Sequence, residues 1–294
     1  MRSGVGSLAG RVAATLAAVI ALTAAGCSPE VLFVGDPVFQ ATLPRPDAFE
    51  EAVREAAASA SMRAEIHWPA ERIDSLALAP LLRNHDAPVV ALTPYLSLLA
   101  AEVVVDFPRR RFIGFYGDEP LANVTWVDYD AVPAMTEAGA ALARWVFAGT
   151  GRSAVVLVDE SDRAVAEEGR ALAAGYLAEA GVDPELEVFR SAPTRETVRS
   201  RVQALPPGGE RAVVALLGPA TAWALEFLRD ETTLVAFRHG YLPRDARRVL
   251  FTVRDDVATG IARALAEGGE RVVAPSVLDL SPAHFPSSRR RQTP

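Results

Sequence analysis

Short, mostly apolar runs alternate with longer amphipathic stretches along nearly the whole chain. The short runs have the length of β-strands, whereas the longer stretches repeat apolar residues at helical spacing. Runs that are apolar at almost every position are typical of parallel strands with both faces covered. Strands are expected at 31–35, 62–68, 88–92, 112–116, 124–127, 154–158, 186–189, 212–217, 233–237, 249–253 and 272–278, and helices at 47–60, 71–84, 96–105, 132–147, 163–180, 195–205, 220–229 and 256–267.

The stretch 111–130 divides this pattern into two blocks. Two apolar runs there bracket a Gly-Asp-Glu-Pro break at 117–120, which predicts two short buried strands with a sharp turn between them. Strand and helix alternate on both sides of this stretch, and two such blocks in succession indicate two sheets. We therefore predict an α/β fold of two doubly wound parallel-sheet lobes joined by a multi-strand hinge.

Changes in the pattern suggest the domain boundaries. Residues 1–26 predict a signal peptide, and 284–294 predict a disordered tail. The first lobe is expected to hold 27–126 and 240–268, and the second lobe 127–239 and 269–283. This division assumes that the end of the chain crosses back to the first lobe. The Pro-bearing stretch 36–46 is expected to be a loop.

The N-terminus carries the most specific local pattern. Arg2 and Arg11 precede an apolar run, 12–25, that is too short to span a bilayer and fits the core of a secretory signal. The run leads into LTAAGC, whose small residues before Cys27 resemble a bacterial lipobox, in which cleavage leaves a diacylated cysteine. Because Cys27 is the only cysteine, it forms no internal disulfide. The resemblance implies lipid attachment at Cys27, and a plain secretory peptide is the alternative.

Composition excludes several function classes. The formal net charge of -7 argues against a nucleic-acid binder, which needs a basic surface. All 30 basic residues are arginine, and the absence of lysine excludes P-loop NTPases and lysine-dependent enzymes. The sequence has no Gly-x-Ser-x-Gly elbow, and His67, His85 and His284 lack metal-ligand spacing. We expect no enzymatic activity, no cofactor and no metal.

Candidate ligand contacts follow the predicted strands, because ligands of open parallel sheets lie beyond the carboxyl ends of the strands. The residues there mix aromatic faces with carboxylates, an amide and guanidinium groups. Such a mixture suits a site that buries a ligand ring and orients it with a few hydrogen bonds. Carboxylates accept the paired hydroxyls of a sugar, and arginine binds an anionic group bidentately. The candidates are Asp36, Phe39, Gln40, Tyr95, Tyr116, Asp118, Tyr129, Asp159, Arg238 and Arg254.

Several of these positions have a purely structural alternative. An Asp that follows a strand can cap a helix or form a turn instead of contacting a ligand. His239 can face the site beside Arg238, or it can pair with Asp245. Trp126 alternates to the opposite face of its strand and is expected in the core.

Several segments resemble the basic membrane protein family, a set of bacterial lipoproteins that includes purine nucleoside receptors. The stretch FPRRRFIGFYGDEPLANV matches it at Phe107-Pro108, Arg111-Phe112, Asp118 and Asn123-Val124. RVLFTVRDDVATGIARALAEG resembles a later strand and helix of the family, and Asp36 to Gln40 resembles its first loop. VDYDAVPAMTEAGAALA is similar to sugar-binding proteins and repressor cores of the type I periplasmic-binding fold. The sequence departs from the family where ligand contacts would lie, at Val158-Asp159, Arg238-His239 and Arg254 or Asp255.

The resemblance implies a lipid-anchored solute-binding protein that captures a small polar ligand, nucleoside or sugar-like, between two lobes for an ABC permease in the inner membrane. We expect a monomer at the cell membrane, facing the periplasm or the cell exterior, that meets the membrane only through its anchor and binds no nucleic acid. Two alternatives keep the fold. One is a ligand-sensing lipoprotein that signals to a membrane receptor, and the other is a degenerate envelope scaffold that has lost its site.

Overall fold

The computed structural model describes residues 30–43, 45–205, 210–228, 233–238 and 248–285. These residues form two compact units. The first unit contains the described residues up to Val127 together with Ile261–Val272, and the second contains Asp128–Gly260 together with the described residues from Val273 onward. The chain passes between the units within β5 (Val124–Asp130), α11 (Val257–Glu267) and β11 (Arg271–Leu280).

The first unit is built on a parallel sheet. Its strands are β1 (Glu30–Val34), β2 (Arg63–His67), β3 (Val89–Leu92), β4 (Arg111–Phe115) and the first part of β5, in the order β2-β1-β3-β4-β5. Each neighbouring pair in this order is parallel. The carboxyl ends of all these strands therefore lie at one edge of the sheet, which we call the first carboxyl edge.

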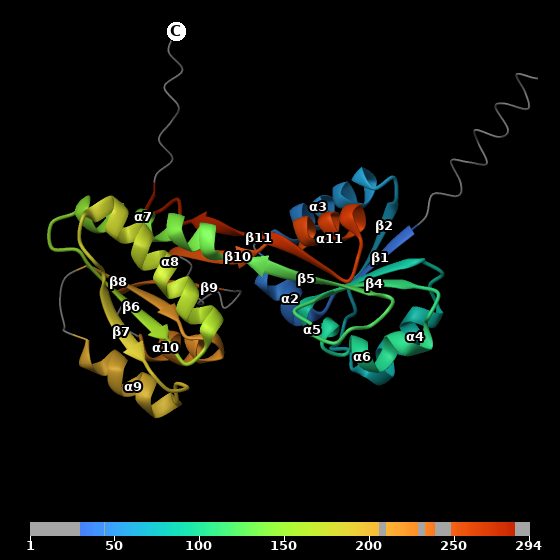
Figure 1. The fold of residues 1–294 in the computed structure, drawn as a ribbon, viewed down its shortest axis with the longest axis horizontal. Coiled ribbons are helices and arrows are strands. Elements are labelled where there is room, and N and C mark those ends of the chain that lie inside the picture. The colour runs from blue at the N-terminus through green and yellow to red at the C-terminus, as the bar shows by residue number, and fades with distance from the viewer. Residues whose placement is uncertain (1–29, 44, 206–209, 229–232, 239–247, 286–294) are drawn as a thin grey trace, which may run out of the picture. The chain divides into compact units, whose positions relative to one another are not determined.

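Helices cover both faces of this sheet, with α3 (Pro46–Ser59) on one face and α4 (Ser75–Arg83), α5 (Pro94–Ser97) and α6 (Ala100–Val103) on the other (Figure 1). The alternation of side chains along β1 shows why both faces need cover. Leu32 and Val34 pack in one core with Leu78 of α4, whereas Phe33 lies edge-on to Phe49 of α3. Trp126 is buried in the α4 side of this core, as expected from its position in the strand.

The second unit repeats this architecture. Its strands β6 (Ser153–Asp159), β7 (Glu185–Phe189), β8 (Arg211–Leu216), β9 (Thr233–Arg238) and β10 (Val249–Asp255) are parallel in the order β7-β6-β8-β9-β10, and β11 pairs antiparallel with β10. On β6, Val156 faces α7 (Val132–Phe147) and α8 (Arg163–Ala180), whereas Val155 faces α9 (Arg195–Ala204) and α10 (Thr221–Phe227). Figure 1 shows these two helix layers. Each apolar strand therefore contributes side chains to the hydrophobic core on either face of its sheet.

Three local predictions need correction. The stretch 36–46 is not all loop, because Asp36 caps a short helix, α2 (Pro37–Thr42). The expected helix 96–105 is divided into α5, α6 and a 3-10 turn, η1 (Val104–Asp106), which together bring Leu96, Ala100 and Val103 into one core. The expected sharp turn at 117–120 is also wrong, because β4 and β5 are parallel and residues 116–123 must return along the length of the strand.

The second crossing between units lies later in the chain than the sequence pattern suggested. The sequence pattern predicts residues 240–268 in the first lobe, but the described part of this stretch up to Gly260, residues 248–260, belongs to the second unit. The reason is strand pairing, since β10 forms its parallel ladder with β9. Residues 1–26, Cys27 and the tail from 286 onward lie outside the described residues.

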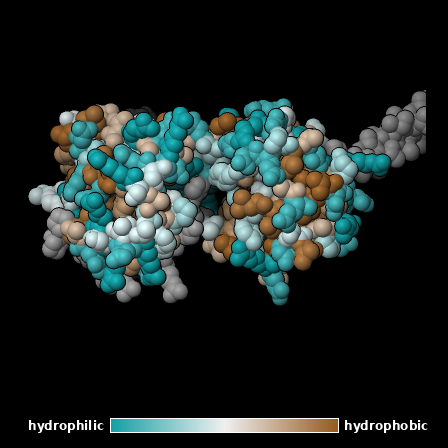
Figure 2. Space-filling model, turned by 60° about the horizontal axis from the view of Figure 1, so that its bottom comes forward, coloured by the Kyte–Doolittle hydropathy of each residue, from teal (hydrophilic) through white to brown (hydrophobic). Residues whose placement is uncertain are grey.

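Exposed apolar side chains gather on the first unit, on the side that carries α4 and α6 (Figure 2). Leu76 on α4 is 83% exposed, and Leu98 and Val105 in the following segments are 68% and 65% exposed. In the part of the chain that the structure describes, no helix has both the length and the hydrophobicity needed to cross a membrane.

Candidate functional site

Two aromatic rings stack at the first carboxyl edge. Phe39 on α2 and Trp68, which follows β2, are nearly parallel at 17° with ring centroids 6.5 Å apart. Trp68 is held in place because its Nε1 donates to Glu50 Oε1 at 3.0 Å. Gly35 leaves room for the indole, since a Cβ there would lie 2.0 Å from Trp68 Cε3. The end of β1 is therefore shaped around the ring of Trp68.

A tyrosine and an arginine extend the same edge. Tyr95 lies in α5, directly after β3, and the guanidinium carbon of Arg72 lies 4.3 Å from the centre of its ring. Helices α2 and α5 are tied together at their starts, because the Thr93 hydroxyl donates to Asp36 Oδ2 at 2.5 Å. The aromatic groups that follow β1, β2 and β3 thus belong to one connected edge.

Tyr116 directly follows β4 and has a strained backbone conformation. Its φ is 60°, in the left-handed region that costs a non-glycine residue about 1–2 kcal/mol. Its side chain is 41% exposed, and Asp118, two residues later, is also exposed. Strain of this kind is often found where a side chain is held for a functional contact. Tyr116 is consequently the most accessible of the aromatic candidates in this unit.

The remaining candidates of the first unit are less accessible. Asp36 is fully buried, and its carboxylate accepts from Phe39 N at 2.9 Å and from Thr93, as expected for a helix cap. Gln40 is half-buried, and its backbone N–H donates to Asp36 O at 3.0 Å. In this arrangement Asp36 acts by fixing α2 and α5, and a direct ligand contact of Asp36 or Gln40 stays a prediction.

The second unit has a buried charge cluster at the carboxyl ends of β9 and β10. Arg238 forms ion pairs with Glu168 of α8 and with Asp255 Oδ1, the latter at 3.5 Å. Ser276 Oγ donates to the same Asp255 oxygen at 2.6 Å. The side chains of Arg238, Glu168 and Asp255 are only 17%, 7% and 4% exposed. The guanidinium is therefore shared between two carboxylates of its own unit.

Tyr129 lies close to this charge cluster. Its hydroxyl donates to the carbonyl oxygen of Asp256 at 3.1 Å. Burial raises the pKa of the Tyr129 phenol above its ordinary value, and the nearby charges of Asp255 and Asp256 raise it further. Both causes disfavour a phenolate, so Tyr129 offers a neutral hydroxyl and a ring.

Asp159 and Arg254 have partners of their own. Asp159 Oδ1 accepts from the backbone N–H of Ser161 at 2.9 Å and from its hydroxyl at 2.6 Å, which forms a local turn. Arg254 pairs with Asp279 across the antiparallel β10–β11 ladder, where both side chains are nearly half exposed. The proposed alternatives for His239 and Asp245 lie outside the described residues.

Sequence reasoning missed four members of these groups: Trp68, Arg72, Glu168 and Ser276. Trp68 is the last residue of a predicted strand and Arg72 follows it, so the carboxyl-end rule could have found them. Glu168 lies within a helix and Ser276 within the last strand, and nothing in the local pattern distinguishes them. Among the described residues, no group of three or more His, Cys, Asp or Glu side chains is arranged to hold a metal ion.

Known structures resemble this chain over most of its length. No protein-family model and no curated protein matches the sequence. A solute-binding protein of an ABC transporter system from Aeropyrum pernix is 13% identical, with a TM-score of 0.52 over 85% of this chain and 76% of its own. A second such protein, from Conexibacter woesei, is 15% identical, with a TM-score of 0.52 over 87% and 89%.

A transcriptional activator of the comK gene from Bacillus halodurans is similar to the same extent. It is 11% identical, with a TM-score of 0.55 over 86% of this chain and 91% of its own. At such identities the likeness concerns the fold alone. It confirms the fold predicted from the sequence: the chain is an α/β protein of two doubly wound units, with the type I periplasmic-binding-protein fold.

Proposed function

We propose that this chain is a solute-binding protein that recognises a small polar ligand with the carboxyl edges of its sheets. The observation that carries this proposal is the set of aromatic side chains at the first carboxyl edge, namely Phe39, Trp68, Tyr95 and Tyr116. Ligands of open parallel sheets bind at this end of the strands, and aromatic faces bury ligand rings there. The two similar solute-binding proteins of ABC transporter systems support the same reading.

The chemistry of the two units favours a nucleoside or a sugar-like ligand. In the first unit, aromatic rings provide faces for a base or for the apolar face of a sugar. In the second unit, the charge of Arg238 is already balanced by Glu168 and Asp255, which disfavours an anionic ligand group there. Binding is the proposed activity, with no covalent step.

Ligand-dependent stabilisation tests the proposal directly. We expect thermal unfolding to shift upward with one class in a panel of nucleosides, sugars, amino acids and small anions. A ligand at ~100 times its dissociation constant adds about 2.7 kcal/mol, which raises the midpoint by roughly 5–10 °C. Tyr116→Asn should abolish the shift, since asparagine tolerates the left-handed backbone but removes the ring.

Phe147→Asn is the matched control. Phe147 is 64% exposed at the end of α7, away from the carboxyl edges, so this variant should keep the full ligand response. Equal responses of the two variants would refute the role of Tyr116. A panel that moves no midpoint would instead favour the degenerate scaffold.

We further propose that the protein is lipid-anchored through Cys27 and delivers its ligand to an ABC permease. The anchor is supported by the apolar run 12–25 and the small residues directly before the only cysteine. Wild type is expected to sediment with membranes and to be released only by detergent, whereas Cys27→Ser should lose incorporation of labelled fatty acid. Unchanged labelling of the serine variant would show that another residue carries the lipid or that none does.

A further inference from the structure

One buried indole supports residues 116–123, which we call the return segment because they lead from the end of β4 back to the start of β5. Trp126 lies on β5 directly beside Gly114 of β4 in the parallel pairing. Its ring lies against the backbone of Gly114, where an added Cβ would be 2.4 Å from Trp126 Cζ3. The ring also reaches Gly117, where an added Cβ would lie 2.4 Å from Cη2. The glycines on either side of Tyr116 therefore both pack against Trp126.

The same indole holds the return segment by a hydrogen bond. Trp126 is buried, and its Nε1 donates to the carbonyl oxygen of Glu119 at 2.7 Å. Trp145 of α7 is buried as well, yet its Nε1 has no hydrogen-bond partner among the described residues. Burial of an indole in this chain thus does not by itself require such a bond. The bond from Trp126 is directed at the backbone that follows Tyr116.

Two further contacts fix the first half of the return segment. The backbone N–H of Tyr116 donates to Val127 O at 3.1 Å, which ties the segment to β5. Arg271, at the start of β11, donates from Nη2 to Gly117 O at 2.8 Å, and its side chain is exposed. Arg271 therefore holds at the surface the same stretch of backbone that Trp126 supports from the core.

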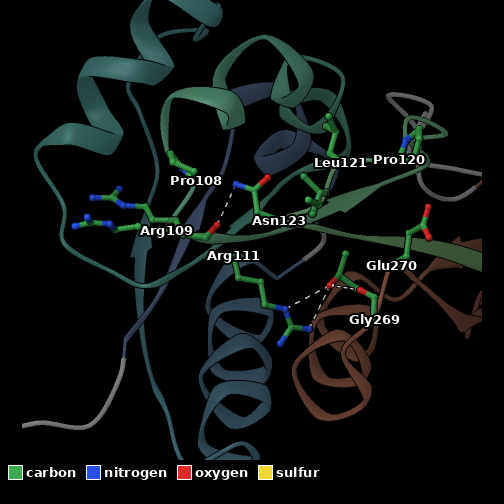
Figure 3. Close-up of a pocket in the computed structure, with 12 residues that line it drawn as sticks. Pro108, Arg109, Arg111, Pro120, Leu121, Asn123, Gly269 and Glu270 are labelled. Carbon is green, nitrogen blue, oxygen red and sulfur yellow. Dashed lines mark hydrogen bonds between the residues drawn. The ribbon is translucent and has the colours of Figure 1, made fainter.

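The far end of the return segment is fixed by an amide. Asn123 donates from Nδ2 to the carbonyl oxygens of Val104, Phe107 and Arg110, at 3.3, 3.2 and 3.1 Å. Figure 3 shows this side chain and its bond to Arg110 O. The segment is consequently held at both ends and at two points between them.

These contacts oppose the strain at Tyr116. Its left-handed backbone conformation, with φ at 60°, is about tenfold less favourable for a non-glycine residue than a relaxed one. A return segment without support would therefore relax at this residue and carry the tyrosine ring to another place. The hydrogen bonds from Trp126 and Arg271 to the following backbone resist that change.

We propose that Trp126 is a positioning residue for ligand recognition, which holds the return segment so that the ring of Tyr116 is presented at the first carboxyl edge. Arg271 assists it from the surface. A side chain held in place before binding loses little entropy when a ligand arrives. This inference rests on the proposed function, because it takes the Tyr116 ring as a ligand contact.

Hydrogen exchange of the full chain, in the form to which the cell processes it, tests the positioning without any ligand. Trp126→Phe keeps a ring in the core but removes the Nε1 donor, and Arg271→Met removes an exposed donor without leaving a cavity. We expect the amides of Tyr116 and Leu121 to exchange about three- to tenfold faster in each variant, the effect of losing one hydrogen bond. Amides of β3 in the same sheet report the stability of the whole unit and should change less.

Trp145→Phe and Arg199→Gln are the matched controls. The first removes a buried indole whose Nε1 makes no hydrogen bond within the described residues, and the second removes a charge from an exposed position on α9. Both positions belong to the second unit, so neither variant should change exchange in the return segment. Exchange of that segment at the wild-type rate in Trp126→Phe and Arg271→Met would overturn the inference.

Calorimetric titration with adenosine, uridine, ribose and glucose measures the consequence for binding. For any of these probes that binds wild type, we expect the dissociation constant to rise about three- to tenfold in Trp126→Phe and in Arg271→Met. The reason is that apparent affinity falls with the fraction of molecules that present Tyr116. Faster exchange with an unchanged dissociation constant would contradict the positioning role and leave the proposed solute binding intact. If wild type binds none of these probes, the proposed nucleoside or sugar binding fails, and the ligand role of Trp126 fails with it.

Discussion

Arg238→Met is expected to lower the free energy of unfolding of the second unit by about 3–5 kcal/mol. The substitution removes the cation shared by Glu168 and Asp255 and leaves two buried carboxylates without their partner. Ser276 still donates to Asp255, but within the described residues no other side chain pairs with Glu168. Hydrogen exchange of peptides from β6 and β9 measures the loss within this unit.

Arg254→Met provides the matched control for this prediction. Arg254 also lies near the end of a strand and pairs with a carboxylate. Its side chain and that of Asp279 are 45% and 46% exposed, however. An exposed pair of this kind contributes about 1 kcal/mol or less. Adding Glu168→Gln to Arg238→Met should recover part of the stability, because it removes one of the unpaired charges. Equal losses in Arg238→Met and Arg254→Met would argue against a cost of burial.

Gly175→Ala is expected to destabilise the second unit by about 2 kcal/mol. Helices α7 and α8 pack so closely that a Cβ on Gly175 would lie 1.9 Å from the carbonyl oxygen of Thr136. Gly139 faces the opposite backbone in the same way, at 1.9 Å from Leu172 O. Overpacking against backbone costs about 3 kcal/mol, which exceeds the gain of about 1 kcal/mol in helix propensity. Chemical denaturation, read from the fluorescence of Trp145 on α7, measures the difference.

Gly169→Ala separates crowding from helix propensity. Gly169 lies on the same helix, but its added Cβ would meet only the side chain of Val158, at 2.7 Å. A side chain can move where a backbone carbonyl cannot, so this variant should stay within about 1 kcal/mol of wild type. A loss at Gly169 as large as that at Gly175 would mean that the helix contact does not control stability.

The candidate site was only partly predictable from the sequence. The carboxyl-end rule placed Phe39, Tyr95 and Tyr116 at one edge of the first sheet. It did not reveal that Arg238 is paired with Glu168. Glu168 lies within a helix, and the apolar spacing of that helix indicates which face is buried but not which residue Glu168 contacts. The rule also proposed Arg254 and Arg238 as equivalent ligand contacts. Arg254 forms its ion pair at the surface, whereas Arg238 forms its ion pairs in the interior.

The fold class and the two cores follow from the sequence pattern alone. Apolar strand runs and helical spacing repeat locally, and each element must bury its own apolar side chains, so helices 132–147 and 163–180 are found where the pattern predicts them. Which side chains contact one another depends on the three-dimensional arrangement of the elements. Partners such as Phe39 and Trp68, or Glu168 and Arg238, lie on different elements. Their contact depends on which strands are neighbours and how closely the helices pack. The spacing of apolar residues within one strand or helix specifies neither.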